Sequence, residues 1–438
     1  MTRPSRAALH AGVWALALTG MAPSQAGAQS ISTQVFDTVV PFTYNRGRNE
    51  SVMDRVRPEY DPIGVNLGGF TLLPTLSVNG GYTNNVYQSS TFKVDAATVT
   101  VVPRVLLRSN WAVHGLSLDA NGNFVRYLGQ SARNEDGWSV GGQGRLDIGP
   151  DQSLNIGART SRLYETPFSG TGVPVARSAL PTQASIFKAL ADFKFARTRL
   201  VLSADHSRYN YLSAETFAGT RLTRDTFDRH ITRFTGHGEY GLTPDAGLFL
   251  QGTYSDTSYR LPLSPGIANR DSSEVQLLGG VSLDVTALVR GSLAVGYIDR
   301  SYNSPLYRDI QGLSVSGKIE YFPSELTTFT LAVRRDIEDA TLTGTSGFFN
   351  NGIAARLDHE LLRNLILNFG VDYEHDSYRG VTATADIART SAGGRYILSP
   401  AMVLDTSLSY RKRSTNAALI IGPNISEFRA TFGITIRR

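Results

Sequence analysis

The sequence predicts an all-β fold: an antiparallel transmembrane β-barrel of the bacterial outer membrane with about 18 strands. Three observations predict it. Segments alternate apolar and polar residues with a period of two, their connections alternate between short and long, and the N-terminus resembles an export signal. The chain has no cysteine, and only 18% of its residues are charged against 41% hydrophobic. Disulfide-rich and highly charged disordered proteins are thereby excluded.

Residues 1–28 have the three regions of a secretory signal peptide. Arg3 and Arg6 precede the apolar run AGVWALALTGM, and Ala26-Gly27-Ala28 follows it. The run is too short to span a bilayer as a helix, so we expect cleavage near Ala28 and localisation to the cell outer membrane. Cleavage would remove two arginines and lower the formal charge of the chain from +5 to +3 (5 − 2). A net charge this small does not indicate a nucleic-acid-binding protein.

From residue 69 onward the alternation describes strands with one apolar and one polar face. Leu365, Leu367 and Phe369, for example, alternate with Asn368, Gly370 and Asp372. The predicted strands are 69–84, 94–108, 111–127, 136–148, 152–163, 183–195, 199–210, 230–241, 246–259, 272–285, 289–301, 311–321, 325–337, 351–360, 364–377, 384–397, 401–413 and 425–437.

The connections between these segments fall into two classes in alternation. Short turns include Ser109-Asn110, Gly149-Pro150-Asp151, Thr243-Pro244-Asp245 and Ser399-Pro400, and the longest loops lie near 164–182 and 211–229. Bacterial outer-membrane barrels have an even number of strands, short turns toward the periplasm and long loops outside. A soluble β-sandwich gives no reason for this segregation of loop lengths.

Aromatic residues cluster near the predicted strand ends, as interfacial girdles require. Near short turns these are Trp111, Phe195, Tyr240, Tyr321, Phe322 and Tyr396, and near long loops they are Tyr164, Tyr209, Tyr259 and Tyr302. The apolar face is then expected to contact lipid, and the polar face to line a lumen too wide for side chains alone to fill.

Residues 29–68 lack sustained alternation and precede the barrel domain, residues 69–438. This segment is expected to be a periplasmic tail, a strap that docks a partner, or a piece of chain folded into the lumen, where Arg55, Arg57, Glu59 and Asp61 would suit polar surroundings.

The stretch from Arg46 to Tyr87 carries a family resemblance. Its pieces are Arg57-Pro58-Glu59-Tyr60-Asp61-Pro62, Leu67-Gly68-Gly69-Phe70, and Tyr82 with Asn84-Asn85. It resembles the N-terminal signature of the putative β-barrel porin 2 family of alphaproteobacterial outer-membrane proteins. Members often accompany exopolysaccharide loci, so the resemblance implies a role in moving surface polysaccharide. The chain departs from many outer-membrane barrels by ending in Ile436-Arg437-Arg438 instead of an aromatic residue.

The charged residues on the polar faces are the candidate pore-lining set. They are Arg104, Arg108, Arg145, Arg159, Arg233, Lys318, Arg334, Arg356, Arg389, Arg395 and Arg411, with Asp147, Glu239, Asp284, Glu320, Asp336, Asp358, Asp372, Glu374, Asp376 and Asp405. One interpretation is a wet channel of mixed charge, whose arginines bind carboxylates of acidic sugars. The other is a set of ion pairs across the wall that only keep the lumen polar.

Catalytic, metal and cofactor sites are not expected. His359-Glu360 lacks the second histidine of a zinc protease helix, because residue 363 is arginine. Asp205 and His206 are adjacent on a strand and point to opposite faces, so they cannot share a site. Aromatic residues in or beside the long loops, namely Phe168, Phe217, Phe227, Tyr307, Phe348 and Phe349, would either stack on sugar rings or pack loops onto the rim. An inward fold of loop 164–182 would give a constriction.

The leading functional hypothesis is an outer-membrane channel that passes polar solutes, with a role in exopolysaccharide export. The alternatives are a barrel with a blocked lumen that serves a structural or docking role, and a barrel hydrolase, for which no coherent site is found. Expected partners are outer-membrane lipid, the barrel-assembly machinery, periplasmic polysaccharide-export proteins and the polysaccharide itself.

Overall fold

The computed structural model describes residues 50–168, 176–285, 288–340 and 345–438. The predicted signal peptide, residues 1–28, and residues 29–49 lie outside these ranges. Within them, no helix has the length and apolarity to cross a bilayer.

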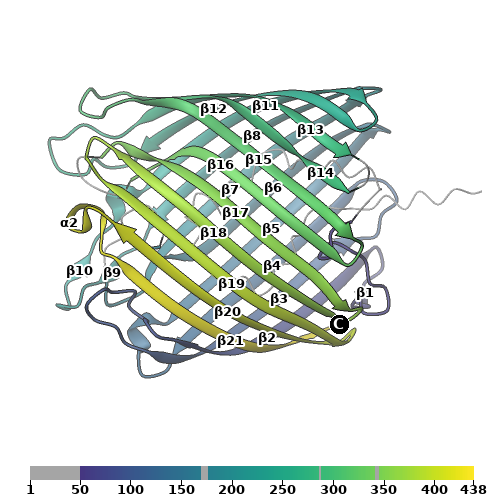
Figure 1. The fold of residues 1–438 in the computed structure, drawn as a ribbon, viewed down its shortest axis with the longest axis horizontal. Helices are drawn as coiled ribbons and strands as arrows, with labels where there is room; N and C mark the ends of the chain where they lie inside the picture. The colour runs from purple at the N-terminus through teal and green to yellow at the C-terminus, as the bar shows by residue number, and fades with distance from the viewer. Residues whose placement is uncertain (1–49, 169–175, 286–287, 341–344) are drawn as a thin grey trace, which may run out of the picture.

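Eighteen antiparallel strands close into a barrel, seen from the side in Figure 1. They are β2 (Phe70–Thr83), β3 (Ala96–Ser109), β4 (Gly115–Tyr127), β5 (Glu135–Gly149), β6 (Gln152–Glu165), β7 (Leu180–Phe195), β8 (Thr198–Tyr211), β11 (Arg229–Thr243), β12 (Ala246–Tyr259), β13 (Ser272–Val285), β14 (Val289–Tyr302), β15 (Ile310–Ser324), β16 (Thr327–Glu338), β17 (Gly347–Leu362), β18 (Leu365–Arg379), β19 (Thr384–Ser399), β20 (Met402–Thr415) and β21 (Ile425–Arg437). Each pairs with its sequence neighbour, and β2 pairs with β21, from Thr75↔Arg437 to Thr83↔Arg429, to close the ring. The predicted fold class and strand number are confirmed.

The remaining elements lie at the two ends of the barrel. β1 (Val65–Asn66) pairs with β2 at the end that carries the short turns, near the C-terminus (Figure 1). The hairpin β9 (Ala214–Glu215) and β10 (Arg221–Leu222), the 3₁₀ turns η1 (Ser131–Arg133) and η2 (Asp225–Phe227), and the single-turn α2 (Ala418–Ile421) belong to long connections. We call these the short-turn end and the long-loop end.

One turn is longer than predicted. The sequence placed the β3–β4 turn at Ser109-Asn110, whereas β4 begins only at Gly115. His114 adopts a left-handed backbone with φ of 66°, which a strand cannot accommodate, and its backbone N–H donates to the Asp147 carboxylate at 3.0 Å. Trp111 therefore lies in the turn, with its ring packed edge-on against Phe70 at 5.4 Å between centroids.

The two faces of the wall differ as the alternation predicts. Large apolar side chains are exposed on the outer face, for instance Leu250 at 58% and Tyr297 at 51%, and their neighbours point inward. In the short-turn girdle, Trp111, Phe195, Tyr240, Tyr321 and Tyr396 are exposed as expected.

Part of the predicted girdle is wrong. Three of the predicted girdle residues are at most 6% exposed, namely Phe322, Tyr209 and Tyr259. Each occupies a position of its strand whose side chain points to the inner face, as Tyr209 shows by its pairing with the inward Arg229. Tyr302 also points inward, where its hydroxyl donates to the Ser346 carbonyl oxygen. Toward the long loops the exposed tyrosines are instead Tyr82, Tyr254, Tyr297, Tyr373 and Tyr410.

Glycine is required where β14 passes β13. A Cβ atom on Gly296 would lie 1.8 Å from the carbonyl oxygen of Leu277, which is too close for any other residue. The two strands can therefore pair in their observed register only because position 296 has no side chain.

Candidate functional site: a charged barrel interior narrowed by loops

Every charged residue of the predicted pore-lining set lies on the inner face. In each strand these residues alternate with the apolar side chains that are exposed on the outer face. In the short-turn half the structure joins them into ion pairs across neighbouring strands or along one strand. The N···O distances are 2.7 Å for Arg145–Asp147, 2.5 Å for Arg290–Glu320, 3.1 Å for Lys318–Glu320, 2.8 Å for Arg356–Asp358 and 2.8 Å for Arg395–Asp405.

In the long-loop half the pairs are more deeply buried. Arg334 and Arg389 both reach Glu374, at 2.7 and 2.9 Å, and Arg411 binds Glu427 at 2.6 Å. The side chains of Arg411 and Glu427 are only 5% and 0% exposed, whereas those of Arg145 and Arg356 in the other half are 42% and 45% exposed. The interior is therefore more open toward the short turns and more filled toward the long loops.

Other predicted residues bind neutral or unpredicted partners. Three carboxylates accept hydrogen bonds from neutral side chains: Glu239 from Ser282, Asp376 from Asn350, and Asp336 from Gln276. Arg233 donates a hydrogen bond to Ser255, and Arg159 forms a 2.6 Å ion pair with Asp119. Arg104, Arg108, Asp284 and Asp372 also lie on the inner face. Asp205 is buried there and His206 is exposed on the outer face, so the two do point apart.

The connection between β6 and β7 enters the interior at Phe168, where it meets the opposite wall. Phe168 is fully buried, its carbonyl oxygen accepts from Arg389 at 3.1 Å, and its ring lies 4.8 Å from the guanidinium of Arg411. Arg389 and Arg411 belong to β19 and β20, on the far side of the β2–β21 closure from β6. The returning arm is held by Arg133, which donates to the carbonyl oxygens of Ala176 and Ser178. The inward fold of this loop is thus seen at its described ends.

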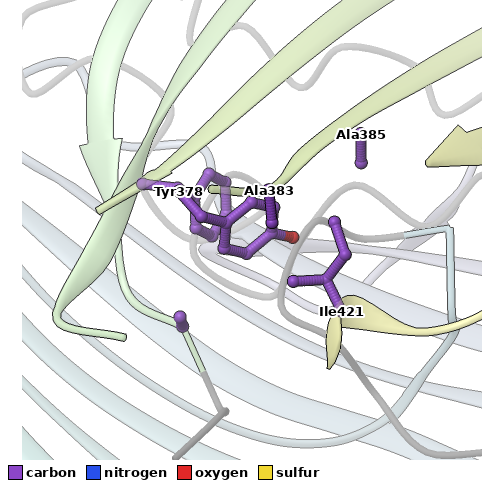
Figure 2. Close-up of a cluster of buried hydrophobic side chains, with 6 residues drawn as sticks. Tyr378, Ala383, Ala385 and Ile421 are labelled. Carbon is purple, nitrogen blue, oxygen red and sulfur yellow. The ribbon is translucent and has the colours of Figure 1, made fainter. Parts of the chain in front are cut away.

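Ion pairs and a hydrogen bond also hold the start of the connection between β16 and β17 against the inner face. Asp339 pairs with Arg300 at 2.6 Å and with Arg229 at 3.4 Å, and the Ala340 carbonyl oxygen accepts from Arg270 at 2.6 Å. Ala340 then joins a buried cluster with Phe348, Tyr378, Ala383, Ala385 and Ile421, part of which Figure 2 shows. Burial raises the pKa of Asp339, but the guanidiniums of Arg300, Arg229 and Arg270 outweigh it and hold the pKa below the ordinary 3.8.

A pH response follows from Asp339. Because its pKa is lowered by folding, its ionised form stabilises the loop above the ordinary pKa, and this stabilisation is lost as pH falls through the lowered value. We expect the single-channel current to change as pH falls below the ordinary value of 3.8. D339N should show the changed current at every pH, whereas D225N, at an exposed loop pair with Arg260, should match wild type. A pH-independent wild-type current down to pH 2.5 would contradict this expectation.

Loop aromatics mostly pack rather than protrude. Phe168, Phe348, Phe349 and Tyr307 are at most 8% exposed, which favours the rim-packing alternative for them. Phe217 is 48% exposed and lies 5.1 Å from Tyr87 and 5.9 Å from Phe92 between ring centroids. Since Tyr87 and Phe92 belong to the β2–β3 connection and Phe217 to the β8–β11 connection, these rings meet across the long-loop end.

The N-terminal segment, residues 50–64, binds the inner face at the short-turn end. The buried Val52 N–H donates to Thr328 Oγ1 at 2.9 Å, and Arg57 forms a 2.6 Å ion pair with Glu360 whose side chains are 6% and 3% exposed. Arg55 also reaches Glu360, at 3.5 Å. Further along, Arg437 donates to the Tyr60 carbonyl oxygen at 2.6 Å. The segment therefore runs along the short-turn opening from the wall of β16 and β17 to β21.

Removing the Glu360 carboxylate should release this segment. E360Q leaves the buried Arg57 without its counter-charge, a change that costs about 3–5 kcal/mol. We expect trypsin to cut after Arg55 at least about a hundredfold faster than in wild type, since local opening controls cleavage and each ~1.4 kcal/mol changes an opening equilibrium tenfold. E59Q is the matched control, because the Glu59–Arg363 pair beside it is nearly half exposed on both sides. Equal cleavage rates in the two variants would show that the buried pair does not hold the segment.

Several residues of the interior were missed by the sequence analysis. Glu427 lies two residues before Arg429 on β21, so both side chains point to the same face, and the alternation pattern could have predicted its inward position. Asp339 and Phe168 lie beyond strand ends, where no periodic pattern assigns a face. Within the described residues, no cluster of three His, Asp or Glu side chains is arranged to hold a metal ion.

These features define an outer-membrane, porin-like β-barrel. The family model described as Putative beta-barrel porin 2 matches residues 57–438, and the chain belongs to that family. This confirms the resemblance carried by the residues from Arg57 to Asn85. No curated protein matches the sequence.

Several solved structures are similar to this chain at low identity. Pseudomonas aeruginosa OpdK, crystallised with vanillate, is similar with 13% identity and a TM-score of 0.46, over 84% of this chain and 99% of that one. P. aeruginosa OccK2 (OpdF) is similar with 12% identity and a TM-score of 0.46, over 84% and 98%. The siderophore receptor PirA of the same organism is similar with 9% identity and a TM-score of 0.45, over 84% and 80%.

Proposed function

We propose that this barrel is a passive channel for hydrated polar solutes. The observation that carries the proposal is the set of partly exposed Arg–carboxylate pairs on the inner face. In the short-turn half, Arg145 and Arg356 keep more than two fifths of their side-chain surface exposed. Exposed charges in a barrel of this width need water beside them, and a water-filled, mixed-charge interior passes polar solutes.

The long-loop half would set selectivity. There the β6–β7 connection meets Arg389 and Arg411 through Phe168, so a solute must pass a narrowed zone rich in guanidinium groups. Guanidinium forks bind carboxylates in a bidentate manner, which favours acidic sugars over neutral ones of the same size. Transport would be driven by diffusion or by a periplasmic partner.

Export of a surface exopolysaccharide is the specific role we propose, since the family resemblance implies it. The N-terminal segment then lies on the periplasmic side, where polysaccharide-export proteins would deliver the chain, and the barrel-assembly machinery would insert the protein. An enzymatic role is disfavoured because Asp205 and His206, which are adjacent on β8, lie on opposite faces of the wall.

The second candidate is a barrel with a blocked lumen that serves a structural or docking role. Its support is that both ends are narrowed, by the N-terminal segment and by the inward loops. Conductance of folded protein in a planar bilayer separates the two. We expect ion conductance that acidic oligosaccharides block more strongly than neutral ones. Absence of conductance, both with and without residues 50–60, would reject the channel and favour the structural role.

A further inference from the structure

Basic residues on the outer face are confined to one half of the barrel. All outward-facing Arg and Lys side chains of the described barrel strands lie in the half next to the long loops: Arg126, Arg162, Arg208, Arg335, Arg379 and Lys412. Toward the short turns the outer face carries apolar residues such as Phe195, Tyr240 and Leu398. One membrane leaflet therefore meets guanidinium groups and the other does not.

Four neighbouring strands carry the densest group, which we call the β6–β11 outer patch: Arg162, Gln183, His206, Arg208 and His230. Strand pairing places them side by side, with Arg162 opposite Gln183 and Arg208 opposite His230. The rings of His206 and His230 stack at 5.6 Å, and His206 Nδ1 lies 2.9 Å from Thr232 Oγ1. The outer face of β6, β7, β8 and β11 has no carboxylate in the described residues. Asp256 on β12, opposite Thr232, and Asp136 on β5, which is paired with Arg126, lie at the two edges.

The guanidinium groups of the patch are not committed to carboxylates. Arg162 Nε is covered and has no hydrogen-bond partner, and Arg208 Nε donates only to the neutral Asn210, at 3.3 Å. Neither arginine forms an ion pair with a carboxylate in the described part of the chain. By contrast, Arg126 is paired with Asp136 at 2.5 Å, and Arg335 lies 4.3 Å from the Phe349 ring and donates to the Leu313 carbonyl oxygen.

Apolar side chains adjoin the patch toward the middle of the wall. Phe187, Leu202 and Phe234 are 51%, 47% and 55% exposed on the same strands. A ligand that contacts both surfaces must have an anionic head and long apolar chains. Phosphate suits the head, because guanidinium groups bind it through paired charge-assisted hydrogen bonds, and basic clusters at the membrane surface recruit anionic lipid headgroups.

We propose that the β6–β11 outer patch binds the phosphorylated headgroup of a lipid in the leaflet nearest the long loops. Arg162 and Arg208 contact the phosphate, His206 and His230 add imidazole donors, and the acyl chains lie along Phe187, Leu202 and Phe234. Such a lipid would fix the depth of the barrel in the bilayer. This inference requires only the membrane-embedded barrel and stands whether or not the lumen conducts.

The test measures lipid binding to the folded, full-length protein in detergent by native mass spectrometry. The probes are bisphosphorylated lipid A, its dephosphorylated form and phosphatidylethanolamine, with inorganic phosphate as competitor. The double variant R162Q/R208Q is compared with R126Q/R335Q, which also removes two outward arginines from the same half. We expect R162Q/R208Q to weaken lipid A binding by roughly tenfold or more, and the control by less than about twofold, because two charge-assisted bonds are lost only in the first.

Three outcomes would overturn the proposal. Equal weakening by both double variants would indicate a general basic belt, and no weakening by either would exclude the patch. Displacement of lipid A by millimolar inorganic phosphate would show a free-anion site instead of a lipid site. Folding is checked by heat-modifiable gel mobility, and R208Q alone, at an exposed side chain, should still weaken binding about threefold if the double variant folds poorly.

Discussion

Replacing Glu427 by glutamine is expected to lower the free energy of unfolding by about 3–5 kcal/mol. The Glu427 side chain is completely buried on β21, between Arg411 of β20 at 2.6 Å and Arg429 at 2.7 Å, and it accepts a 2.8 Å hydrogen bond from Thr83 of β2. Glutamine would leave two guanidinium groups in the interior without their shared counter-charge. Since Glu427 also joins the two strands that close the barrel, its loss weakens the closure itself.

The measurement is urea unfolding of the detergent-folded protein, followed by the gel-mobility shift between folded and unfolded forms. D136N is the control, because Asp136 pairs with Arg126 at an exposed site where both side chains are about half accessible. We expect that variant to remain within about 0.5 kcal/mol of wild type. A Glu427 variant as stable as D136N would mean that the buried triad contributes nothing to closure.

Deleting residues 168–178 is expected to raise single-channel conductance by roughly twofold or more, because pore cross-section limits ion flow. The deletion removes Phe168 from its position against Arg389 and Arg411, and also the carbonyl acceptors of Arg133. Ion selectivity should shift toward anions as well, since two guanidinium groups lose their cover while Glu374 and Glu427 stay paired.

A matched deletion of residues 261–267 from the β12–β13 loop should leave the conductance unchanged. Two of the three large apolar side chains in that segment, Leu261 and Ile267, are exposed at 38% and 37%. If both deletions raised conductance equally, the narrowing would belong to the loops as a group and not to the β6–β7 connection. No rise in either would place the narrowest point elsewhere, with the N-terminal segment as the next candidate.

The sequence was sufficient to predict the wall of the barrel. Alternation assigns each strand residue to one of two faces, so Asp147, Arg395 and Asp405 were placed on the inner face without coordinates. The same rule, applied to Tyr209 and Tyr259, would have moved them from the outer girdle to the interior. That error came from using distance to the strand end instead of parity.

The ends of the barrel were much less predictable. The burial of Phe168, the contacts of Asp339 and the Arg57–Glu360 pair all join segments far apart in the chain. Loops have no repeating geometry from which a facing direction follows, and a pair 303 residues apart leaves no local signal. The sequence analysis therefore left the N-terminal segment and loop 164–182 with open alternatives.

The sequence by itself determined the strand number, the two faces and the segregation of short and long connections, because each depends on a period-two pattern or on local turn chemistry. Only the tertiary structure decided which charges pair, which loops enter the interior and where unpaired arginines gather on the outer face. Closure of the barrel sets those neighbours, since it brings β2 to β21 and fixes the register of every strand around the ring.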